Sequence, residues 1–324
     1  MNKFKYYFIL LITTISLFSC SKNDTPTIEP LRDYAVQYAT DNTDIEEYLK
    51  TSYITVVNHP GFSDDQDVNI TAIPSGGTQK SIWDQTTYEL KSRNVSLHNI
   101  IYKMYYLVLR AGTGASPCNV DAVLASYKGE YISRTTVSGV TSISATPFEE
   151  VKYPQSFFNL FSTITGWGEI FPQFKTGTYS SNADGTVTHN GFGAGVMFIP
   201  SGLAYYSSGS GIIPSYTPLV FNFKLYEMNR LDQDADGIPS YQEDLNGDGY
   251  MRMLATGVDN PDDTDKDGVP NFVDVDDDGD NYTTKLEIKN PATGLSFPFA
   301  DIPSCTGNTT DPTRIKKHLD KTCQ

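Results

Sequence analysis

Residues 195–205 read Gly-Val-Met-Phe-Ile-Pro-Ser-Gly-Leu-Ala-Tyr, and this stretch decides the fold. Its first five residues are mostly β-branched or large and apolar, which favours a buried strand over 195–199. The proline and the glycine that follow cannot continue a strand, so the strand ends at a turn. Further runs of the same texture, separated by Gly, Pro and Asn, lie at 100–110, 122–127 and 219–226.

One short helical pattern interrupts these strands. Its apolar residues fall at spacings near 3.6 and end before Gly177; they are Ile164, Trp167, Ile170, Phe171 and Phe174. We therefore predict an α+β fold, in which an antiparallel sheet packs on one short helix. An N-terminal helical segment precedes the sheet and a loop-rich C-terminal extension follows it.

The region 31–100 is helical at its start and mixed afterwards. Residues 31–53 carry a helical pattern, and Thr43-Asp44-Ile45-Glu46 resembles a capping box that opens a short helix ending at Leu49. The rest of the region is polar and rich in turn residues, and it gives no functional signal.

The charge of the chain is confined to one block. The formal net charge is −15, from 24 Lys and Arg against 39 Asp and Glu. Residues 232–287 hold 17 acidic and 3 basic residues, so this block alone accounts for −14. A nucleic-acid partner is excluded, because phosphate contacts need clustered Lys and Arg.

The N-terminus predicts export and a lipid anchor. Lys3 and Lys5 precede the apolar run 6–18, as in a secretory signal peptide over 1–19. Leu17-Phe18-Ser19-Cys20 matches a bacterial lipobox, in which Cys20 is lipidated and the polar residues 20–30 form a tether. The alternative is an ordinary signal with a chance cysteine. We expect an extracytoplasmic bacterial lipoprotein of the outer membrane, on its periplasmic or cell-surface face.

Three cysteines remain in the exported chain. Cys305 and Cys323 enclose a short polar loop, and in an oxidising compartment a disulfide between them would stabilise the C-terminus by about 3 kcal/mol. Cys118 is then the odd thiol, and we expect it to be buried as a small apolar side chain.

Four motifs resemble the FKBP-type peptidyl-prolyl cis-trans isomerases, in the order of that family. Tyr127-Lys128-Gly129 is similar to its Tyr-x-Gly, and Ile164-Thr165-Gly166-Trp167-Gly168-Glu169 to its Ile-x-Gly-Trp-x-Glu. Residues 199–205 are similar to its Ile-Pro-x-x-Leu-Ala-Tyr, and residues 212–221 to its Ile-Ile-Pro and closing strand. The resemblance implies an FKBP-like domain over 101–229 and an isomerase acting on proline-containing polypeptides.

The same resemblance implies a proline pocket that needs no metal or cofactor for catalysis. Trp167 would form its floor, and the Tyr205 hydroxyl and the backbone N–H of Ile213 would hold substrate carbonyls. The complete set of pocket residues is Tyr127, Phe148, Glu149, Ile164, Trp167, Tyr205, Ile212, Ile213 and Phe221. The alternative for each apolar member is ordinary core packing. No Gly-x-Ser-x-Gly elbow supports a hydrolase.

Several residues depart from the family pattern. Glu149 stands where the family has Asp, and Tyr206 where it usually has Gly. Pro172 lies inside the helical pattern, and 178–194 inserts a Gly/Ser/Asn-rich excursion. These departures keep open a catalytically weak peptide-binding module or chaperone, and a surface adhesion or glycan-binding protein is a third possibility.

The acidic block repeats the 12-residue calcium loop, with carboxylates at positions 1, 3, 5 and 12 and a turn residue at position 6. Asn281 takes the turn position in the last loop, and Ala255 at position 12 leaves the second loop partial. The expected ligands, loop by loop, are Asp232, Asp234, Asp236 and Glu243; Asp244, Asn246 and Asp248; Asp263, Asp265, Asp267 and Asp274; and Asp276, Asp278, Asp280 and Glu287.

Oxygen ligands at these spacings favour Ca²⁺ in a structural role. Prolines after the turn residues exclude the flanking helices of an EF-hand, and the repeats resemble thrombospondin type-3-like repeats, in which calcium replaces a hydrophobic core. The alternative is a solvated acidic spacer. We expect the calcium repeats to span 230–290 and a C-terminal tail to span 291–324.

Overall fold

The computed structural model describes residues 30–323. Residues Asp33–Gln324 form one compact unit. The expected signal peptide, Cys20 and most of the tether lie outside the described residues. Within 30–323, none of the helices combines the length and the apolar character that crossing a membrane requires.

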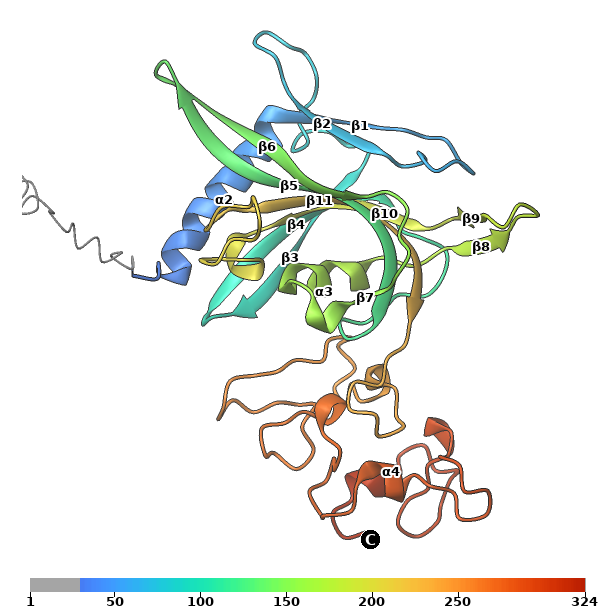
Figure 1. Cartoon of the computed structure of the whole chain (residues 1–324). Coiled ribbons are helices and arrows are strands. Elements are labelled where there is room, and N and C mark those ends of the chain that lie inside the picture. The colour runs from blue at the N-terminus through green and yellow to red at the C-terminus, as the bar shows by residue number, and fades with distance from the viewer. Residues whose placement is uncertain (1–29, 324) are drawn as a thin grey trace, which may run out of the picture. The chain divides into compact units, whose positions relative to one another are not determined.

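A single antiparallel sheet forms the body of the protein (Figure 1). Its strands, in spatial order, are β3 (Glu89–Leu97), β4 (Ile100–Arg110), β10 (Gly193–Ile199), β11 (Leu219–Asn229), β5 (Ala122–Val137) and β6 (Val140–Val151). The short strand β7 (Phe158–Asn159) pairs with β5. The predicted α+β class is therefore confirmed, and the sheet also takes in β3, which precedes the expected domain start at residue 101.

A helix covers each face of the sheet (Figure 1). Side chains alternate between the faces, so Met197 and Ile199 of β10 pack with α3 (Thr165–Ile170), whereas Val196 and Phe198 pack with α2 (Tyr34–Thr51). Both faces are apolar, which explains the nearly continuous hydrophobic run of β10 in the sequence.

The short helix α3 is positioned by close contact with the sheet. A Cβ at Gly166 would lie 2.5 Å from the side chain of Ile199, so only glycine lets the helix approach this near. The helix ends where the 3-10 turn Phe171–Gln173 begins, because Pro172 has no N–H to donate within a longer helix.

The N-terminal helix differs from its prediction. It begins at Tyr34, and Asp33 caps it by accepting hydrogen bonds from the N–H groups of Ala35 and Val36. Thr43 is not a cap: it lies inside the helix and its hydroxyl donates to the Ala39 carbonyl at 2.8 Å. The predicted capping box is therefore wrong, because Thr43 lies in the interior of one longer helix, Tyr34–Thr51, whose N-cap is Asp33.

Two further hairpins lie outside the main sheet. One joins β1 (Ser52–Val56) to β2 (Val68–Ala72) within the region expected to be mixed. The other joins β8 (Thr178–Ser181) to β9 (Val187–Asn190), and it is the excursion that the sequence indicated between the helix and β10.

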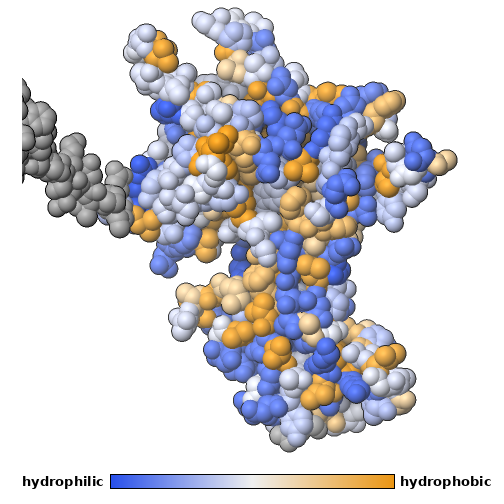
Figure 2. All heavy atoms as spheres, in the orientation of Figure 1, coloured by the Kyte–Doolittle hydropathy of each residue, from blue (hydrophilic) through white to orange (hydrophobic). Residues whose placement is uncertain are grey.

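Residues after 230 form a loop-rich extension, as predicted. Its few ordered turns are the short helix α4 (Thr284–Glu287) and the 3-10 turns Ser240–Gln242, Asn271–Val273, Phe299–Asp301 and Lys317–Leu319. Small apolar clusters replace a large core, one of them made by Ile238, Ile288 and Ile302. Its surface mixes hydrophilic and hydrophobic residues (Figure 2).

A buried carboxylate connects α2 to the turn after β10. Asp41 accepts hydrogen bonds from the N–H of Ser201 at 2.7 Å, from its hydroxyl at 2.6 Å and from the side chain of Gln37 at 2.7 Å. Ser201 begins the 3-10 turn Ser201–Leu203, which leads directly to Tyr205. The helix thus supports the loop that carries a predicted pocket residue.

We expect Asp41→Ala to lower the free energy of unfolding by about 3 kcal/mol, because it leaves the buried N–H and hydroxyl of Ser201 without acceptors. Thr43→Ala, two residues away on the same helix, should change it by less than about 0.5 kcal/mol. Urea unfolding followed by circular dichroism measures both. Equal effects of the two substitutions would contradict the role of Asp41.

Candidate functional site

A cavity of about 490 Å³ opens beside α3 and the loop after β10. This volume lies in the range of small-ligand sites, about 300–1,000 Å³. The residues that line it are Tyr127, Phe148, Glu149, Phe158, Ser162, Thr163, Ile164, Thr165, Trp167, Ala204, Tyr205 and Phe221. Seven of the nine predicted pocket residues are among them.

Aromatic rings form the apolar part of the cavity. The buried Trp167 makes edge-to-face contacts with Tyr127 at 5.0 Å and with Phe221 at 5.3 Å between ring centroids. Phe148 stands edge-to-face to Phe221 at 5.6 Å. Gly129 leaves room for this packing, since a Cβ there would lie 2.4 Å from Phe148. Such pairs hold each ring in a defined orientation.

Few polar groups face this apolar surface. The Tyr127 hydroxyl donates a hydrogen bond to the carboxylate of Glu149 at 2.7 Å. An acid at this position therefore serves as the acceptor for the tyrosine. Burial, followed by the hydrogen bond to Glu149, raises the pKa of Tyr127. The indole N–H of Trp167 is buried and, within residues 30–323, has no hydrogen-bond partner.

The backbone donor predicted at Ile213 is wrong. Its N–H donates to the carbonyl of Ser210 at 2.8 Å and is therefore already used. Ile212 is exposed, Ile213 is buried in the core, and neither lines the cavity. Ile164 does line it as the residue before α3, and in the described chain its N–H donates to no backbone acceptor. The cavity thus offers a different backbone donor from the expected one.

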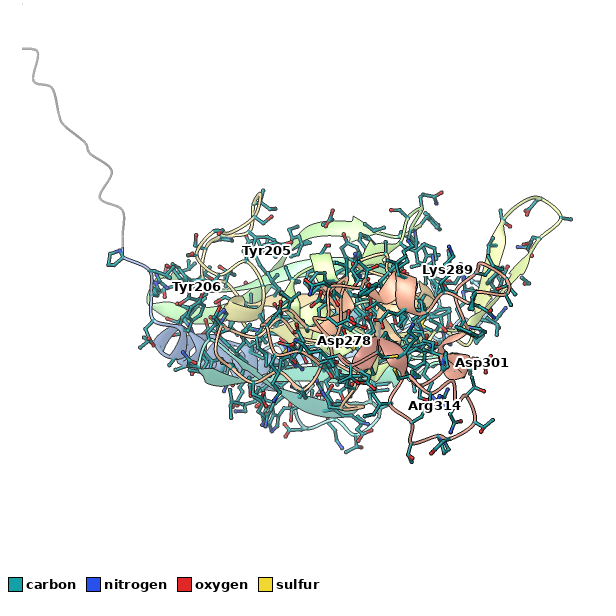
Figure 3. All side chains as sticks on the ribbon, turned by 90° about the horizontal axis from the view of Figure 1, so that it is seen from below. Tyr205, Tyr206, Asp278, Lys289, Asp301 and Arg314 are labelled. Carbon is teal, nitrogen blue, oxygen red and sulfur yellow. The ribbon has the colours of Figure 1, made fainter. Side chains whose placement is uncertain are left out.

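Tyr205 and Tyr206 point to different places, although they are neighbours in sequence (Figure 3). Tyr205 lines the cavity, and among residues 30–323 its hydroxyl has no hydrogen-bond partner. Tyr206 has a φ of +43° and stacks on Tyr34 at 4.2 Å, next to α2. Tyr206 therefore does not line the cavity.

Sequence reasoning missed five lining residues. The largest is Phe158 of β7, which stands 5.6 Å from Trp167 and 5.8 Å from Tyr127. The others are Ser162, Thr163, Thr165 and Ala204. Thr165 and Ala204 lie inside recognised motifs, and Ser162 and Thr163 lie one or two residues before one; the Phe157-Phe158 pair in the sequence is the signal that could have found Phe158.

The C-terminal extension is attached to the pocket helix. Glu169 of α3 is 2% exposed and pairs with Arg93 of β3 at 2.7 Å and with Arg252 of the extension. The Tyr250 hydroxyl donates to the Glu169 carbonyl at 3.0 Å. Arg93 also lies over the Tyr250 ring, 3.7 Å from its centroid. The extension thus contacts the helix that carries Trp167.

The four acidic loops share one backbone geometry. In each, the first Asp accepts a hydrogen bond from the N–H at position 6, at 2.7–3.0 Å. Position 6 has a positive φ every time, and Asn281 adopts +75°, as predicted for this substitute for glycine. The acidic side chains of three loops converge: Asp232, Asp234 and Asp236; Asp263, Asp265 and Asp267; and Asp276, Asp278 and Asp280.

The loop carboxylates fit a hard cation. Oxygens of Asp234, Asp278 and Asp280 and both oxygens of Glu287 are buried without a partner in residues 30–323. Burial and then the neighbouring acids raise the pKa of Asp234 and of Glu287 to about 8. Only oxygen donors are present, which suits Ca²⁺, and these carboxylates would hold it.

The partial second loop has an additional acid that its sequence spacing did not reveal. Asp262 is buried and accepts hydrogen bonds from the N–H groups of Leu245 and Asn246, at 3.0 and 3.3 Å. It therefore supports this loop from a position seven residues after Ala255, the residue at position 12.

The cysteines agree with one expectation and leave another open. Cys118 is buried as predicted. Cys305 and Cys323 carry free thiols in the structure. They are neighbours, since burial and a hydrogen bond with Cys305 raise the pKa of Cys323 to about 12. The disulfide between them stays a prediction.

One family model matches the C-terminal part of the chain. The family model described as BamM C-terminal matches residues 233–312, which contain the acidic loops and most of the tail. The match crosses the boundary expected at residue 290. No curated protein matches the chain.

Solved structures are similar to a little under half of the chain. One is the peptidyl-prolyl cis-trans isomerase of Pseudomonas syringae pv. tomato, with 24% identity over 43% of this chain and 80% of that chain, and a TM-score of 0.30. FkpA from Escherichia coli has 26% identity over 43% of this chain and 51% of its own, with a TM-score of 0.30. The N-terminal domain of FKBP42 from Arabidopsis thaliana has 14% identity over 45% of this chain and 95% of its own, with a TM-score of 0.31. The chain spans about half the length of the E. coli protein.

We expect Glu169→Gln to lower the free energy of unfolding by about 3 kcal/mol, because it leaves two arginines without their shared counter-charge. Glu150→Gln, at an exposed position of β6, is the matched control and should change it by less than about 0.5 kcal/mol. Thermal and urea unfolding measure both variants. Indistinguishable melting of the two would contradict the contribution of the Glu169 pairs.

Proposed function

We propose that the sheet domain is a peptidyl-prolyl cis-trans isomerase of the FKBP type, which assists the folding of extracytoplasmic proteins. The observation that carries the proposal is the cavity: an aromatic floor and walls with a few unpaired donors at its edge. The motifs that resemble the family supply seven of its lining residues. Its substrates would be proline-containing polypeptides.

The chemistry of isomerisation suits such a cavity. Rotation about a peptide bond is opposed by about 18–20 kcal/mol, because resonance gives the C–N bond partial double-bond character. The twisted amide has lost this resonance, so a site that binds the twisted form better than either planar isomer accelerates rotation. The rings of Trp167, Phe221 and Phe148 would enclose the proline and exclude water from it.

Donors at the edge of the cavity would orient the substrate. The hydroxyl of Tyr205 and the N–H of Ile164 are both unpaired in the described chain and can each donate to a peptide carbonyl. Glu149 holds the Tyr127 ring through its hydroxyl and leaves that hydroxyl unable to donate elsewhere. Glu149 therefore acts as a positioning residue in this proposal.

A protease-coupled assay with a proline-containing peptide tests the proposal on the chain from Ser21 onward. Tyr205→Phe should lower kcat/KM about 2- to 10-fold, since one hydrogen bond contributes about 0.5–1.5 kcal/mol. Trp167→Ala should lower it more than tenfold, because it removes the floor. Tyr206→Phe is the matched control, since Tyr206 stacks on Tyr34 outside the cavity, and it should retain wild-type activity.

The same assay separates the second candidate, a catalytically weak peptide-binding module or chaperone. The motivation is the set of departures from the family pattern, and the β8–β9 hairpin is one of them. Peptide binding followed by tryptophan fluorescence reports on Trp167, one of only two tryptophans. Binding by a wild-type protein that isomerises no faster than Trp167→Ala would reject the enzyme and favour this module.

We further propose that Ca²⁺ orders the acidic repeats and that a lipid on Cys20 anchors the chain in the outer membrane. The buried, unpaired carboxylates support the first proposal, since their mutual repulsion needs a counter-charge. The lipobox spacing and the polar residues after it support the second. Mass spectrometry of the membrane fraction, with Cys20→Ala as control, tests the anchor.

Removal of calcium should increase cleavage by a protease within 230–290 while the sheet domain stays intact. At a Ca²⁺ concentration ten times Kd, each bound ion stabilises the folded segment by about 1.4 kcal/mol, and a chelator removes that contribution. Limited proteolysis with and without a chelator, read by mass spectrometry, measures the effect; readdition of Ca²⁺ is the control. Identical cleavage under both conditions would reject ordering by calcium.

A further inference from the structure

Three buried carboxylates from two different loops meet in the C-terminal extension. Asp236 and Glu243 belong to the first loop, whereas Asp277 belongs to the last. Asp236 and Glu243 are each 2% exposed, and Asp277 is 1% exposed. One oxygen from each carboxylate lies within 4.8 Å of the other two. Asp277 is not one of the ligands that loop spacing predicts.

Five of the six oxygens of these carboxylates have no hydrogen-bond partner in the described chain, and the sixth, Oδ1 of Asp236, accepts from the N–H of Ile238 at 2.7 Å. Both oxygens of Glu243, both oxygens of Asp277 and Oδ2 of Asp236 are buried and make no hydrogen bond within residues 30–323. The nearby Lys285 donates its ammonium to the Ala235 carbonyl at 3.0 Å instead of forming an ion pair with them. Buried charges of one sign cost several kcal/mol each unless a counter-charge is close.

Burial raises the pKa values of two of these acids, as expected for carboxylates whose charged form is costly to bury. Burial, followed by the charge of Asp277, raises the pKa of Glu243 to about 11. Burial and Asp236 raise the pKa of Asp277 to about 9. A divalent cation among the three oxygens would supply the counter-charge that these buried, unpaired carboxylates lack.

Asp277 belongs to a different carboxylate group from its neighbours in the last loop. It occupies position 2 of the last loop, and its neighbours at positions 1 and 3, Asp276 and Asp278, converge on their own loop. The carboxylate of Asp277 groups with those of Asp236 and Glu243 instead, so it lies outside the group formed by its own loop. The other loops have Gln233, Leu245 and Thr264 at this position, so only the last loop places an acid there.

We propose that Asp236, Glu243 and Asp277 form a shared Ca²⁺ site, which joins the first loop to the last. This inference rests on the proposed calcium role of the loops and adds a ligand and a connection to it. Ca²⁺ is the expected ion because the donors are all oxygens in an irregular arrangement, whereas Mg²⁺ requires a strict octahedron.

The charge balance requires a second ion at this place. When all of them are ionised, the four carboxylates of the first loop and Asp277 carry −5 together. One Ca²⁺ would leave −3, and two leave −1. Asp236 and Glu243 would therefore bridge the first loop's own ion and the shared ion.

The shared site would close the chain between the two loops. Residues 244–276 lie between them and contain Tyr250 and Arg252, the two residues that contact Glu169 of the pocket helix. Joining the ends of a segment lowers the entropy of its open forms. Ca²⁺ at this site would thus order the part of the extension that touches α3.

Calcium binding to the chain from Ser21 onward, measured by equilibrium dialysis and calorimetry with CaCl₂, tests the site. Asp277→Asn keeps the shape of the side chain and should bind one Ca²⁺ fewer, or bind one at least tenfold more weakly. Glu243→Gln should weaken two ions. Asp259→Asn, an exposed acid of the same extension, is the matched control and should bind as the wild type does.

Limited proteolysis at millimolar CaCl₂ gives a second readout, in which Asp277→Asn should be cut faster within 244–276 than Asp259→Asn. Unchanged ion number, affinity and protection in Asp277→Asn would overturn the shared site and leave the calcium role of the loops intact. Absence of calcium binding in the wild type would overturn both. Circular dichroism of the sheet domain verifies that each variant folds.

Discussion

The ion pairs of Glu169 are the constraint on which the rest of the arrangement depends. Helix α3 has six residues, too few to be stable without tertiary contacts. A carboxylate that is 2% exposed must be paired, and its partners come from β3 and from the extension, as Arg93 and Arg252. The orientation of Trp167, two residues earlier on the helix, therefore depends on both.

This constraint links the two parts of the chain energetically. The ions proposed for the acidic loops would stabilise the segment that carries Arg252, and Arg252 stabilises the charge of Glu169. Loss of the ions would free Arg252 and leave Glu169 with Arg93 alone. The extension is then more than a spacer, since its order contributes to the geometry of the cavity through one side chain.

The local sequence pattern predicted those features of the fold that are determined by residues close together in the sequence. The strand at 195–199, the short helix and the turn at Asn281 are all set by residues within a few positions, and the structure confirms them. Thr43 misled because a capping signature inside a longer helix has the same letters as one at its start. Asp277 was missed because spacing within a loop cannot identify a ligand from another loop.

The backbone donors of the cavity could not be identified from local sequence either. The sequence shows that Ile164 and Ile213 carry N–H groups, but which one is free depends on the tertiary turn that brings the Ser210 carbonyl to Ile213. Tyr206 is a similar case, since its positive φ is strained for a tyrosine and is offset by stacking on Tyr34. A residue that departs from the family pattern thus connects the Tyr205 loop to α2. The departure from glycine there supports the loop and leaves the mouth of the cavity open.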